Sequence, residues 1–382
     1  MIGKATVAIL LVVETWDVAV VGGGPAGLSA AHAAARAGAR TVVLEKATHP
    51  RYKTCGGGLI GTSLAAVADR IDVPADDRVG RATFTCDGRR EFTRRHDGLL
   101  TMVRREEFDH ALRKAAADAG AEVRERVTVR GLHESAGHVE VRLASGTPMR
   151  ARAVVGADGS SGITARHVGV RYTQVDLGLE VELPIPPAQQ ARWRGRLLLD
   201  WGPIPGSYAW VFPKGDRLTV GVIASRGQGE ETKGYLRRFV ERLGLSGIEP
   251  VHDSGHLTRC RADDSPLRQG RVVVAGDAAG LLEPWTREGI SFALRSGELA
   301  GAAAAAGDLG AYPVAVQETL APEMHAGRRL LAAFAKHPGT FHTVLATPVG
   351  WHLFKRFCAG EPALVDAVRR RGVRAALSAL GG

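Results

Sequence analysis

The sequence has few cysteines and no long hydrophobic run, and each shortage excludes a class of protein. Its four cysteines are scattered, with no pair at Cys-x-x-Cys spacing: Cys55, Cys86, Cys260 and Cys358. This pattern argues against a disulfide scaffold and a structural zinc site, so we expect no metal and a reducing, cytoplasmic setting. No apolar run reaches the roughly 18 residues of a membrane-spanning helix, which excludes an integral membrane bundle.

Aromatic residues and lysines are also scarce. Aromatic residues make up 5% of the 382 residues, and only eight of the 50 basic residues are lysine. The excess of arginine, alanine and glycine is typical of codon bias in a GC-rich genome, so part of the net charge of +10 carries no functional meaning. A positive surface still attracts anionic lipid, phosphate and diphosphate groups. No nucleic-acid recognition motif accompanies the charge, so we expect no nucleic-acid partner.

The N-terminus contains a short apolar segment. Residues 5–13 are nearly all apolar and follow Lys4, but no small-residue cleavage site comes after them. We interpret residues 1–14 as a flexible extension or a start-site artefact, with a membrane-touching tail as the less favoured alternative.

The next segment predicts a strand, a glycine-rich turn, a helix and a second strand in that order. The run 17–21 (DVAVV) is short, apolar and β-branched, as a buried parallel strand should be. The turn 22–27 (GGGPAG) follows, then an alanine-rich helix over 26–37 and a second apolar strand over 40–44 that ends at Glu45.

Each glycine of this turn has a physical task. Gly22 permits the tight turn, Gly24 leaves room for a pyrophosphate, and Gly27 lets the helix pack closely on the strand. The helix N-terminus offers free N–H groups to the phosphates, and Glu45 is placed to accept hydrogen bonds from both ribose hydroxyls. The alternative is a glycine-rich turn in some other α/β protein, but the strand, helix and acid together favour a dinucleotide site.

Two downstream strands also end in acids. Residues 153–157 (AVVGA) lead into Asp158, and residues 271–275 (RVVVA) lead into Gly276 and Asp277. Acids at the carboxyl ends of buried strands point at the ligand crevice of an open α/β sheet. A helix then begins at Gly289.

These segments resemble the glutathione-reductase-like flavoproteins, in the branch with the para-hydroxybenzoate-hydroxylase fold. GADGSSG resembles the DG motif of that branch, and GRVVVAGDAAGLLEP resembles its GD motif, whose acid, here Asp277, binds the ribityl chain of FAD. MVRREEFDHAL matches an Arg-x-x-Phe-Asp segment that places Arg105 near the flavin nucleotide. The resemblance implies FAD as the cofactor. No second GxGxxG follows a strand, so we expect no dedicated NAD(P)H domain.

Three further segments resemble the geranylgeranyl reductase family. Residues 51–59 (RYKTCGGGL) carry its Lys-x-Cys-Gly-Gly-Gly motif, and residues 208–214 (YAWVFPK) its Tyr-x-Trp-x-Phe-Pro-Lys motif. Residues 284–290 (PWTREGI) match Pro-x-x-Gly-Glu-Gly-Ile except that Arg287 stands where glycine is usual. The family resemblance implies a flavin-dependent reductase of isoprenoid C=C bonds.

The pattern and the resemblance together assign the candidate site. The predicted FAD-binding residues are Gly22, Gly24, Ala26, Gly27, Glu45, Lys46, Arg105, Asp158, Gly276, Asp277, Gly289 and Ile290. The predicted catalytic residues are Cys55, Tyr208 and Trp210, and the predicted substrate-binding residues are Gly57, Phe212 and Trp285.

The aromatic motif has a meaning of its own. Tyr208, Trp210 and Phe212 alternate along a predicted strand, so they share one face, while Ala209 and Val211 face the other way. Such an aromatic face is either core or a wall for an apolar ligand.

The neighbouring residues leave alternatives open. Cys55 is either a small buried hydrophobe or a pocket residue beside the flavin, and the glycines at 56–58 permit close approach of a flat ring. Arg51 and Lys53 either meet phosphates or are ordinary surface charges, and Lys214 is interpreted as a solvated residue of a hairpin turn.

An isolated prenyl double bond has no carbonyl to polarise it. We expect protonation of the less substituted carbon, tertiary cation character stabilised by aromatic faces, and hydride from N5 of reduced FAD. The candidate acids are Cys55, Tyr208 or a water held by one of them, and the candidate electron donors are NADPH and ferredoxin.

The expected fold is α/β, with a Rossmann-like FAD-binding domain interleaved with an antiparallel-sheet substrate domain, and a helical C-terminal tail. The predicted boundaries are an extension at 1–14, the FAD-binding domain at 15–72, 97–170 and 262–335, the substrate domain at 73–96 and 171–261, and the helical region at 336–382.

The C-terminal region mixes basic and apolar residues, among them Arg374. It is either a peripheral contact with an anionic membrane or a solvated cap over a tunnel. We expect a prenyl diphosphate, prenylated lipid or quinone as substrate. The alternatives are a monooxygenase or halogenase of the same fold, and a non-catalytic FAD-binding redox sensor.

Overall fold

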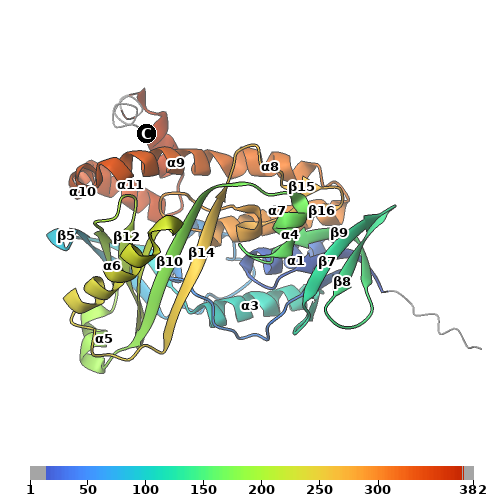
Figure 1. Ribbon diagram of the computed structural model, residues 1–382, viewed down its shortest axis with the longest axis horizontal. Coiled ribbons are helices and arrows are strands. Elements are labelled where there is room, and N and C mark those ends of the chain that lie inside the picture. The colour runs from blue at the N-terminus through green and yellow to red at the C-terminus, as the bar shows by residue number, and fades with distance from the viewer. Residues whose placement is uncertain (1–13, 372, 374–382) are drawn as a thin grey trace, which may run out of the picture.

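The computed structural model describes residues 14–371 and 373, so the apolar segment 5–13 and Arg374 lie outside the described residues. Two sheets lie at opposite ends of the molecule, and the C-terminal helices run along one side of both (Figure 1). Glu14, the last residue of the predicted extension, is ion-paired with Arg124 (Oε2–Nη1 2.6 Å) and so belongs to the fold.

The first sheet contains the predicted dinucleotide fold. Its central strand β1 lies between β2 and β9 in parallel, and β16 continues the parallel order beyond β9. Residues 18–21 of β1 are buried, as expected for the central strand of a parallel sheet, and α1 (Pro25–Arg36) and α7 (Ile290–Ala306) pack against this strand. The strands are β1 (Thr15–Val21), β2 (Thr41–Leu44), β6 (Glu122–Arg124), β7 (Val129–Ser135), β8 (His138–Leu143), β9 (Met149–Gly156), β15 (Arg268–Gln269) and β16 (Val272–Val274).

Glycines allow the helices of this half to pack closely. A Cβ on Gly297 or Gly301 of α7 would lie 2.1 Å from the carbonyl oxygen of Ala26 or Ala30 of α1, so both positions require glycine. The predicted helix at 26–37 is confirmed as α1. The helices of this half are α1 (Pro25–Arg36), α2 (Gly61–Ala65), α3 (Arg105–Asp118), α4 (Ile163–Val168), α7 (Ile290–Ala306), α8 (Ala311–Thr319) and a 3-10 helix (Gly276–Ala279).

The second sheet is antiparallel except where β11 pairs in parallel with β4. Its order is β14-β10-β13-β12-β11-β4-β5-β3, so it draws strands from both predicted substrate segments. Strand β5 runs to Met102, past the predicted boundary at 96, and Gly58–Leu59 joins its edge as β3. The other strands are β4 (Asp77–Cys86), β5 (Arg89–Met102), β10 (Tyr172–Pro184), β11 (Arg196–Trp201), β12 (Tyr208–Lys214), β13 (Arg217–Ser225) and β14 (His252–Arg261).

The two faces of this sheet have different partners. On one face, Ala209 and Val211 are completely buried with Tyr235 and Phe239 of α6 (Gly229–Arg242). The helices of this layer also include α5 (Pro187–Trp193) and a 3-10 turn (Arg226–Gln228). The predicted alternation along 208–212 is confirmed, because the aromatic residues face the opposite side.

The C-terminal helices close that opposite side. Phe334 and Phe341 pack on Trp201 and Trp285, and Phe354 packs edge-on against Phe84 with ring centroids 5.3 Å apart. Such edge-to-face pairs add to the hydrophobic stabilisation of the contact. The helices are α9 (Ala321–Lys336), α10 (Pro338–Ala346), α11 (Pro348–Cys358) and α12 (Ala363–Arg369). Within the described residues, no helix is both long and apolar enough to cross a bilayer.

Candidate functional site

A cavity of about 1180 Å³ lies between the two sheets and under the C-terminal helices. It is lined by the glycine-rich turn after β1, by the aromatic face of β12, and by apolar side chains of α10 and α11. An ordinary ligand pocket measures about 300–1,000 Å³. This cavity therefore has room for a large cofactor and a second, apolar ligand.

The glycine-rich turn has the geometry that its sequence predicts. Gly22 has a φ of +105°, and a Cβ on Gly27 would lie 1.9 Å from the carbonyl oxygen of Gly22. Gly24 differs, because a Cβ there would meet only the Arg51 guanidinium, 3.8 Å away. The space in front of Gly24 and the N-terminus of α1 is therefore open to a diphosphate.

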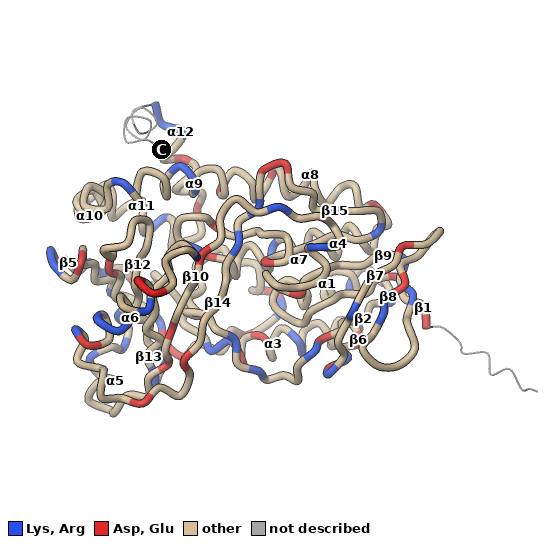
Figure 2. The backbone as a smooth tube through the Cα atoms, in the orientation of Figure 1, with Lys and Arg blue, Asp and Glu red and all other residues tan. Residues whose placement is uncertain are grey.

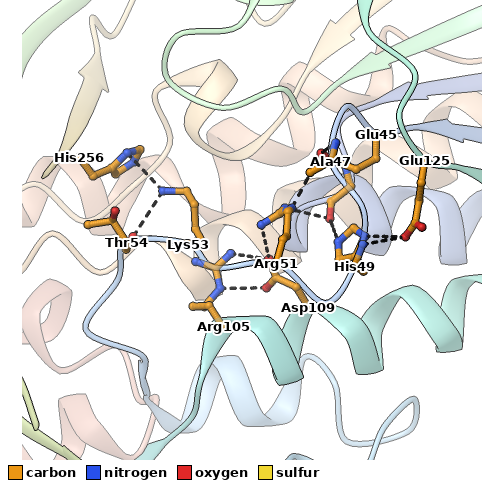
Figure 3. Close-up of polar contacts among 11 residues, drawn as sticks. Glu45, Ala47, His49, Arg51, Lys53, Thr54, Arg105, Asp109, Glu125 and His256 are labelled. Carbon is orange, nitrogen blue, oxygen red and sulfur yellow. Dashed lines mark hydrogen bonds and ion pairs between the residues drawn. The ribbon is translucent and has the colours of Figure 1, made fainter. Parts of the chain in front are cut away.

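Glu45 ends β2 and points back at this turn (Figure 3). Its Oε2 accepts the N–H of Gly23 at 2.6 Å, and its Oε1 accepts the N–H of Ala47 at 2.8 Å. A carboxylate has about four acceptor positions, so Glu45 keeps capacity for ribose hydroxyls. The neighbouring Lys46 also lines the cavity.

Arg105 is the first residue of α3, lines the cavity and points toward Asp109 (Figure 3). Its guanidinium makes a bidentate ion pair with Asp109, at 2.8 Å and 2.9 Å. Burial acts against the charged form, but Asp109 and the thiol of Cys55 outweigh it, so the pKa of Arg105 is raised. Arg105 is therefore a fixed positive charge beside Cys55.

Asp277 lies at one end of a chain of polar contacts. One member of this chain, His256, was not predicted from the sequence. His256 Nε2 lies 3.2 Å from Asp277 Oδ2, and the Nζ of Lys53 lies 3.2 Å from His256 Nδ1. Burial acts to raise the pKa of Asp277, but His256 and the cations Lys53 and Arg105 outweigh it, so the pKa is lowered. His256 lies on β14, and no local pattern in the sequence marks it.

Five more predicted residues either line the cavity or support its lining. The carboxylate of Asp158 accepts the N–H groups of Ile163 (2.7 Å) and Thr164 (3.1 Å), so it caps α4 while lining the cavity. Gly276 has a φ of +55°, and a Cβ there would lie 2.9 Å from the Cβ of Ala26, so this glycine lets its loop pack closely on α1; Gly27 likewise lets α1 pack on β1. Gly289 and Ile290 line the cavity where α7 begins.

The two segments that resemble motifs of the geranylgeranyl reductase family, residues 51–59 and 208–214, contact each other directly. The N–H of Cys55 donates to Glu180 Oε1 (2.7 Å), and Lys214 Nζ donates to the carbonyl of Cys55 (3.1 Å). A Cβ on Gly56 would lie 2.9 Å from the Phe212 ring, and one on Gly57 would lie 2.2 Å from the carbonyl oxygen of Val103. The glycines therefore let the Cys55 loop lie directly on strand β12.

The interpretation of Lys214 as a solvated turn residue is wrong. Lys214 is 1% exposed, and its Nζ makes a 3.0 Å ion pair with Glu182. It is the last residue of β12 and continues the alternation of Tyr208, Trp210 and Phe212 by one more step. The period of two therefore turns it into the interior rather than out to solvent.

The aromatic face of β12 forms a wall of the cavity. Tyr208, Trp210, Phe212 and Trp285 all line it. The Trp210 ring covers Gly221 of β13, where a Cβ would lie 2.1 Å from the indole. Trp210 Nε1 is buried without a hydrogen-bond partner within the described chain, and Tyr208 donates its O–H to the Thr286 carbonyl. These placements favour a ligand wall over simple core.

The contacts of Arg287 explain how an arginine can stand where the family motif has glycine. Its φ is +57°, a left-handed conformation that glycine adopts freely and arginine rarely does. Its Nε pairs with the buried Asp176 at 3.0 Å, its Nη1 donates to the Trp285 carbonyl at 2.7 Å, and its guanidinium lies 5.8 Å from the Tyr208 ring centre. The ion pair fastens the loop before α7 to strand β10.

These observations fit FAD. The open face of Gly24, the free acceptor positions of Glu45 and the unpartnered Trp210 N–H lie along one cavity. The turn would hold the diphosphate, Glu45 the ribose, and Asp277 the ribityl chain. Among the described residues, no cluster of His, Cys, Asp or Glu could hold a metal ion.

Comparisons with known proteins agree with this assignment. A family model described as FAD binding domain matches residues 15–182. The digeranylgeranylglycerophospholipid reductase of Methanocella arvoryzae is 32% identical over 340 residues, covering 80% of this chain and 83% of that protein. The chloroplastic geranylgeranyl diphosphate reductase of Oryza sativa subsp. japonica is 31% identical over 346 residues, covering 83% and 71%.

A solved structure supports the fold. A geranylgeranyl bacteriochlorophyll reductase-like protein of Thermoplasma acidophilum superposes with a TM-score of 0.77, covering 96% of this chain and 99% of that one, at 23% identity. The expected FAD-binding fold with a second sheet and helical tail is confirmed. Taken with the sequence relatives, this places the chain in the geranylgeranyl reductase family, as an FAD-dependent oxidoreductase of the type that acts on CH–CH groups.

Proposed function

We propose that this protein saturates isolated C=C bonds of a geranylgeranyl-type chain carried by a prenyl diphosphate, a prenylated lipid or a quinone. One observation carries the proposal: the dinucleotide turn and the aromatic wall open into the same cavity, which continues between apolar side chains of α10 and α11. A long hydrocarbon chain fits this path, because its other end can leave between the helices.

The residues of the wall suit the chemistry of an unactivated alkene. Reduced FAD, when bound, supplies a hydride from N5. Addition of a proton to the alkene gives tertiary cation character, which the π faces of Tyr208 and Trp210 attract. Trp285 closes the wall on the side of α9 and excludes water from the reacting carbons. Cys55 shapes the pocket where its loop meets Phe212.

Access from an anionic membrane fits the side chains at the cavity mouth. Val344 of α10 is 50% exposed and Val349 of α11 is 66% exposed, and both also line the cavity. Arg90 and Arg94 of strand β5 donate to Thr343 and to the carbonyl of Ala346, on either side of Val344 along the chain. Figure 2 shows basic positions on β5. Apolar residues inside a basic rim are suited to the surface of an anionic bilayer. NADPH or ferredoxin supplies the electrons.

The experiment is an anaerobic single turnover. Protein purified with FAD is reduced with dithionite and mixed with geranylgeranyl diphosphate, a digeranylgeranyl lipid or a prenylated quinone, and products are analysed by mass spectrometry. The proposal expects a gain of two hydrogens per reduced bond with oxidation of the flavin. If no substrate gains hydrogen while the flavin stays reduced, the proposal is wrong.

The same preparation separates the alternatives of this fold. A product that gains one oxygen only when air is admitted would identify a monooxygenase, and halide-dependent product would identify a halogenase. Flavin that cycles without changing any added substrate would favour a redox sensor.

A further inference from the structure

Saturation of a C=C bond consumes a proton as well as a hydride. The acidic residues that line the cavity are the candidate donors of this proton. Most of them hold another part of the site together. Glu45 binds the glycine turn, Asp158 caps α4, and Asp277 is paired with His256. Glu288 accepts both the N–H and the O–H of Ser291 and so caps α7. Glu180 is the remaining acid that lines the cavity, and although it accepts the N–H of Cys55, it does so through Oε1 alone.

Glu180 lies next to the aromatic wall. In the register of the second sheet, Glu180 of β10 is opposite Gly221 of β13, and Gly221 is opposite Trp210 of β12. Directly opposite residues of antiparallel strands share a face. Because Gly221 has no side chain and the Trp210 ring covers it, Glu180 is the next side chain beyond the indole on the cavity side.

The nearby cations pair with the neighbouring carboxylate, Glu182, and not with Glu180. Glu182 lies two residues further along the same face of β10, and both Lys214 (3.0 Å) and Arg217 (3.5 Å) pair with it. Glu180 is 2% exposed and has no ion pair of its own within the described residues. Burial raises the pKa of Glu180 and the Glu182 carboxylate adds to this, against the opposing effects of Lys214 and the Cys55 N–H. Glu182 therefore has two cations beside it, whereas Glu180 has none within contact distance among the described residues.

We propose that Glu180 is the catalytic acid that delivers the proton to the alkene, an inference that rests on the proposed function. Oε1 of Glu180 already accepts from Cys55 N–H (2.7 Å) and Tyr52 O–H (3.3 Å), which leaves Oε2 to hold the proton. The O–H bond breaks as a C–H bond forms on the less substituted alkene carbon. The more substituted carbon takes the hydride from reduced FAD, which is left oxidised, and Glu180 is left as a carboxylate.

A hydrogen-bonded route returns the proton. Tyr52 O–H reaches both Glu180 and Ser254, the latter at 3.0 Å, and Thr54 donates to the same Ser254 at 3.0 Å. These residues are only partly buried, on the edge strand β14 and the loop before Cys55. A proton from water at this edge therefore reaches Oε1 of Glu180 through Tyr52, and a half-turn of the carboxyl group then exchanges Oε1 and Oε2, so that the proton faces the alkene.

The roles expected earlier for Cys55 and Tyr208 change accordingly. Burial raises the pKa of Tyr208, and its O–H is already donated to the Thr286 carbonyl, so it holds its proton rather than delivering it. Cys55 is held by both its N–H and its carbonyl, and it positions the loop against the wall.

The first test needs neither FAD nor substrate. Infrared spectra of the flavin-free protein at pH 7 are compared between wild type and Glu180→Gln, which preserves an acceptor for Cys55 and Tyr52. We expect the wild type to show the C=O stretch of a buried protonated carboxyl that the variant lacks. Absence of this difference would overturn the proposal, whatever the substrate of the enzyme.

The second test is the rate of the anaerobic single turnover. Glu180→Gln should slow alkene reduction about 100-fold or more, the usual range for losing a general acid. Glu180→Asp should recover part of the rate, and FAD content and the affinity for a saturated prenyl diphosphate, measured by calorimetry, should not change. An unchanged rate in Glu180→Gln would overturn the role of Glu180 and leave the proposed function standing. Inactivity of the wild type would instead remove the proposed function, with the infrared result deciding whether Glu180 stores a proton.

Discussion

Individual glycines create the space in this cavity, because they have no side chain. Gly24 leaves the turn open, Gly56 lets the Cys55 loop touch Phe212, and Gly221 lets the Trp210 ring lie flat against its neighbouring strand. In each case a Cβ would fill space that a ring or a ligand group uses. Arg287 is the opposite case, because it places a large side chain where the backbone favours glycine.

The first residue-scale prediction concerns the π face of Trp210. Trp210→Leu keeps an apolar side chain but removes the aromatic ring, so turnover should fall about 2- to 30-fold, matching a cation–π contribution of about 0.5–2 kcal/mol. Trp210→Phe is the matched control and should stay within a few-fold of wild type. Both variants should retain FAD by absorbance. Loss of FAD in Trp210→Leu would mean that the residue is part of the core.

The second residue-scale prediction concerns the Arg287–Asp176 pair. Removing one partner of a buried ion pair costs about 3–5 kcal/mol, and relief of a left-handed arginine returns about 1–2 kcal/mol. Arg287→Gly should therefore lower the free energy of unfolding by about 2 kcal/mol, measured by denaturant titration.

Asp176→Asn combined with Arg287→Gly provides the check on that argument. The double variant should recover part of the loss, because no buried carboxylate remains unpaired. Arg287→Gly alone being more stable than wild type would show that backbone strain, not the ion pair, dominates at this position.

At the scale of elements, most of the correct predictions depend on short local motifs and on the alternation of side chains along a strand. The strand, turn, helix and acid of 17–45 and the alternation along β12 depend on neighbours in the chain, so they were predictable. Glu180, Glu182 and His256 were missed because their partners lie 21 to 125 residues away in the sequence. Lys214 was misassigned because the motif ended where a turn was expected, although the strand includes that residue.

His342 of α10 gives an element-scale prediction with a defined sign. Trp201 Nε1 donates to its Nδ1 (3.0 Å), and its Nε2 contacts the Arg90 carbonyl (2.7 Å), so the fold uses the neutral ring. Burial lowers the pKa of His342 below its usual value. The unfolded chain therefore binds more protons near pH 6, and stability that is present at pH 7.5 is lost as the pH falls through about 6.5.

The measurement is the midpoint of thermal unfolding between pH 7.5 and 5.5. His342→Gln has an acceptor and a donor but does not titrate, so its midpoint should fall less than that of wild type over this range. Equal falls in the two proteins would contradict the assignment of a neutral His342 between β5 and α10.

The first turn of α11 gives the second element-scale prediction. Val349→Asp places a charge at the cavity mouth, and binding to anionic liposomes should fall about 10-fold or more, since it removes about three apolar carbons from the interface at about 0.8 kcal/mol each. Val314→Asp on α8 is the matched control, because Val314 is 57% exposed but does not line the cavity. Equal effects in a sedimentation assay would remove this mouth as the membrane contact.

At the scale of the whole molecule, the cavity depends on segments from the entire chain. The glycine turn comes from the first tenth of the sequence, the wall from the middle and the closing helices from the end. The motifs at 51–59 and 208–214 predicted two sides of the cavity. The helical C-terminal region has no motif, so a membrane contact and a cap over a tunnel both stayed open for it. The contact of these helices with the second sheet depends on the packing of aromatic residues that are far apart in the sequence, so no regular spacing predicts it.

The central claim is that one cavity holds FAD and a prenyl chain against the same wall. The most direct measurement is a crystal structure of the FAD-bound protein grown with a saturated C20 diphosphate, which binds but cannot be reduced. We expect the flavin over the Cys55 loop and the chain within about 4 Å of Trp210 and Phe212, leaving toward Val349. A cavity filled by side chains of α10 and α11, or a chain bound away from the flavin, would contradict the account.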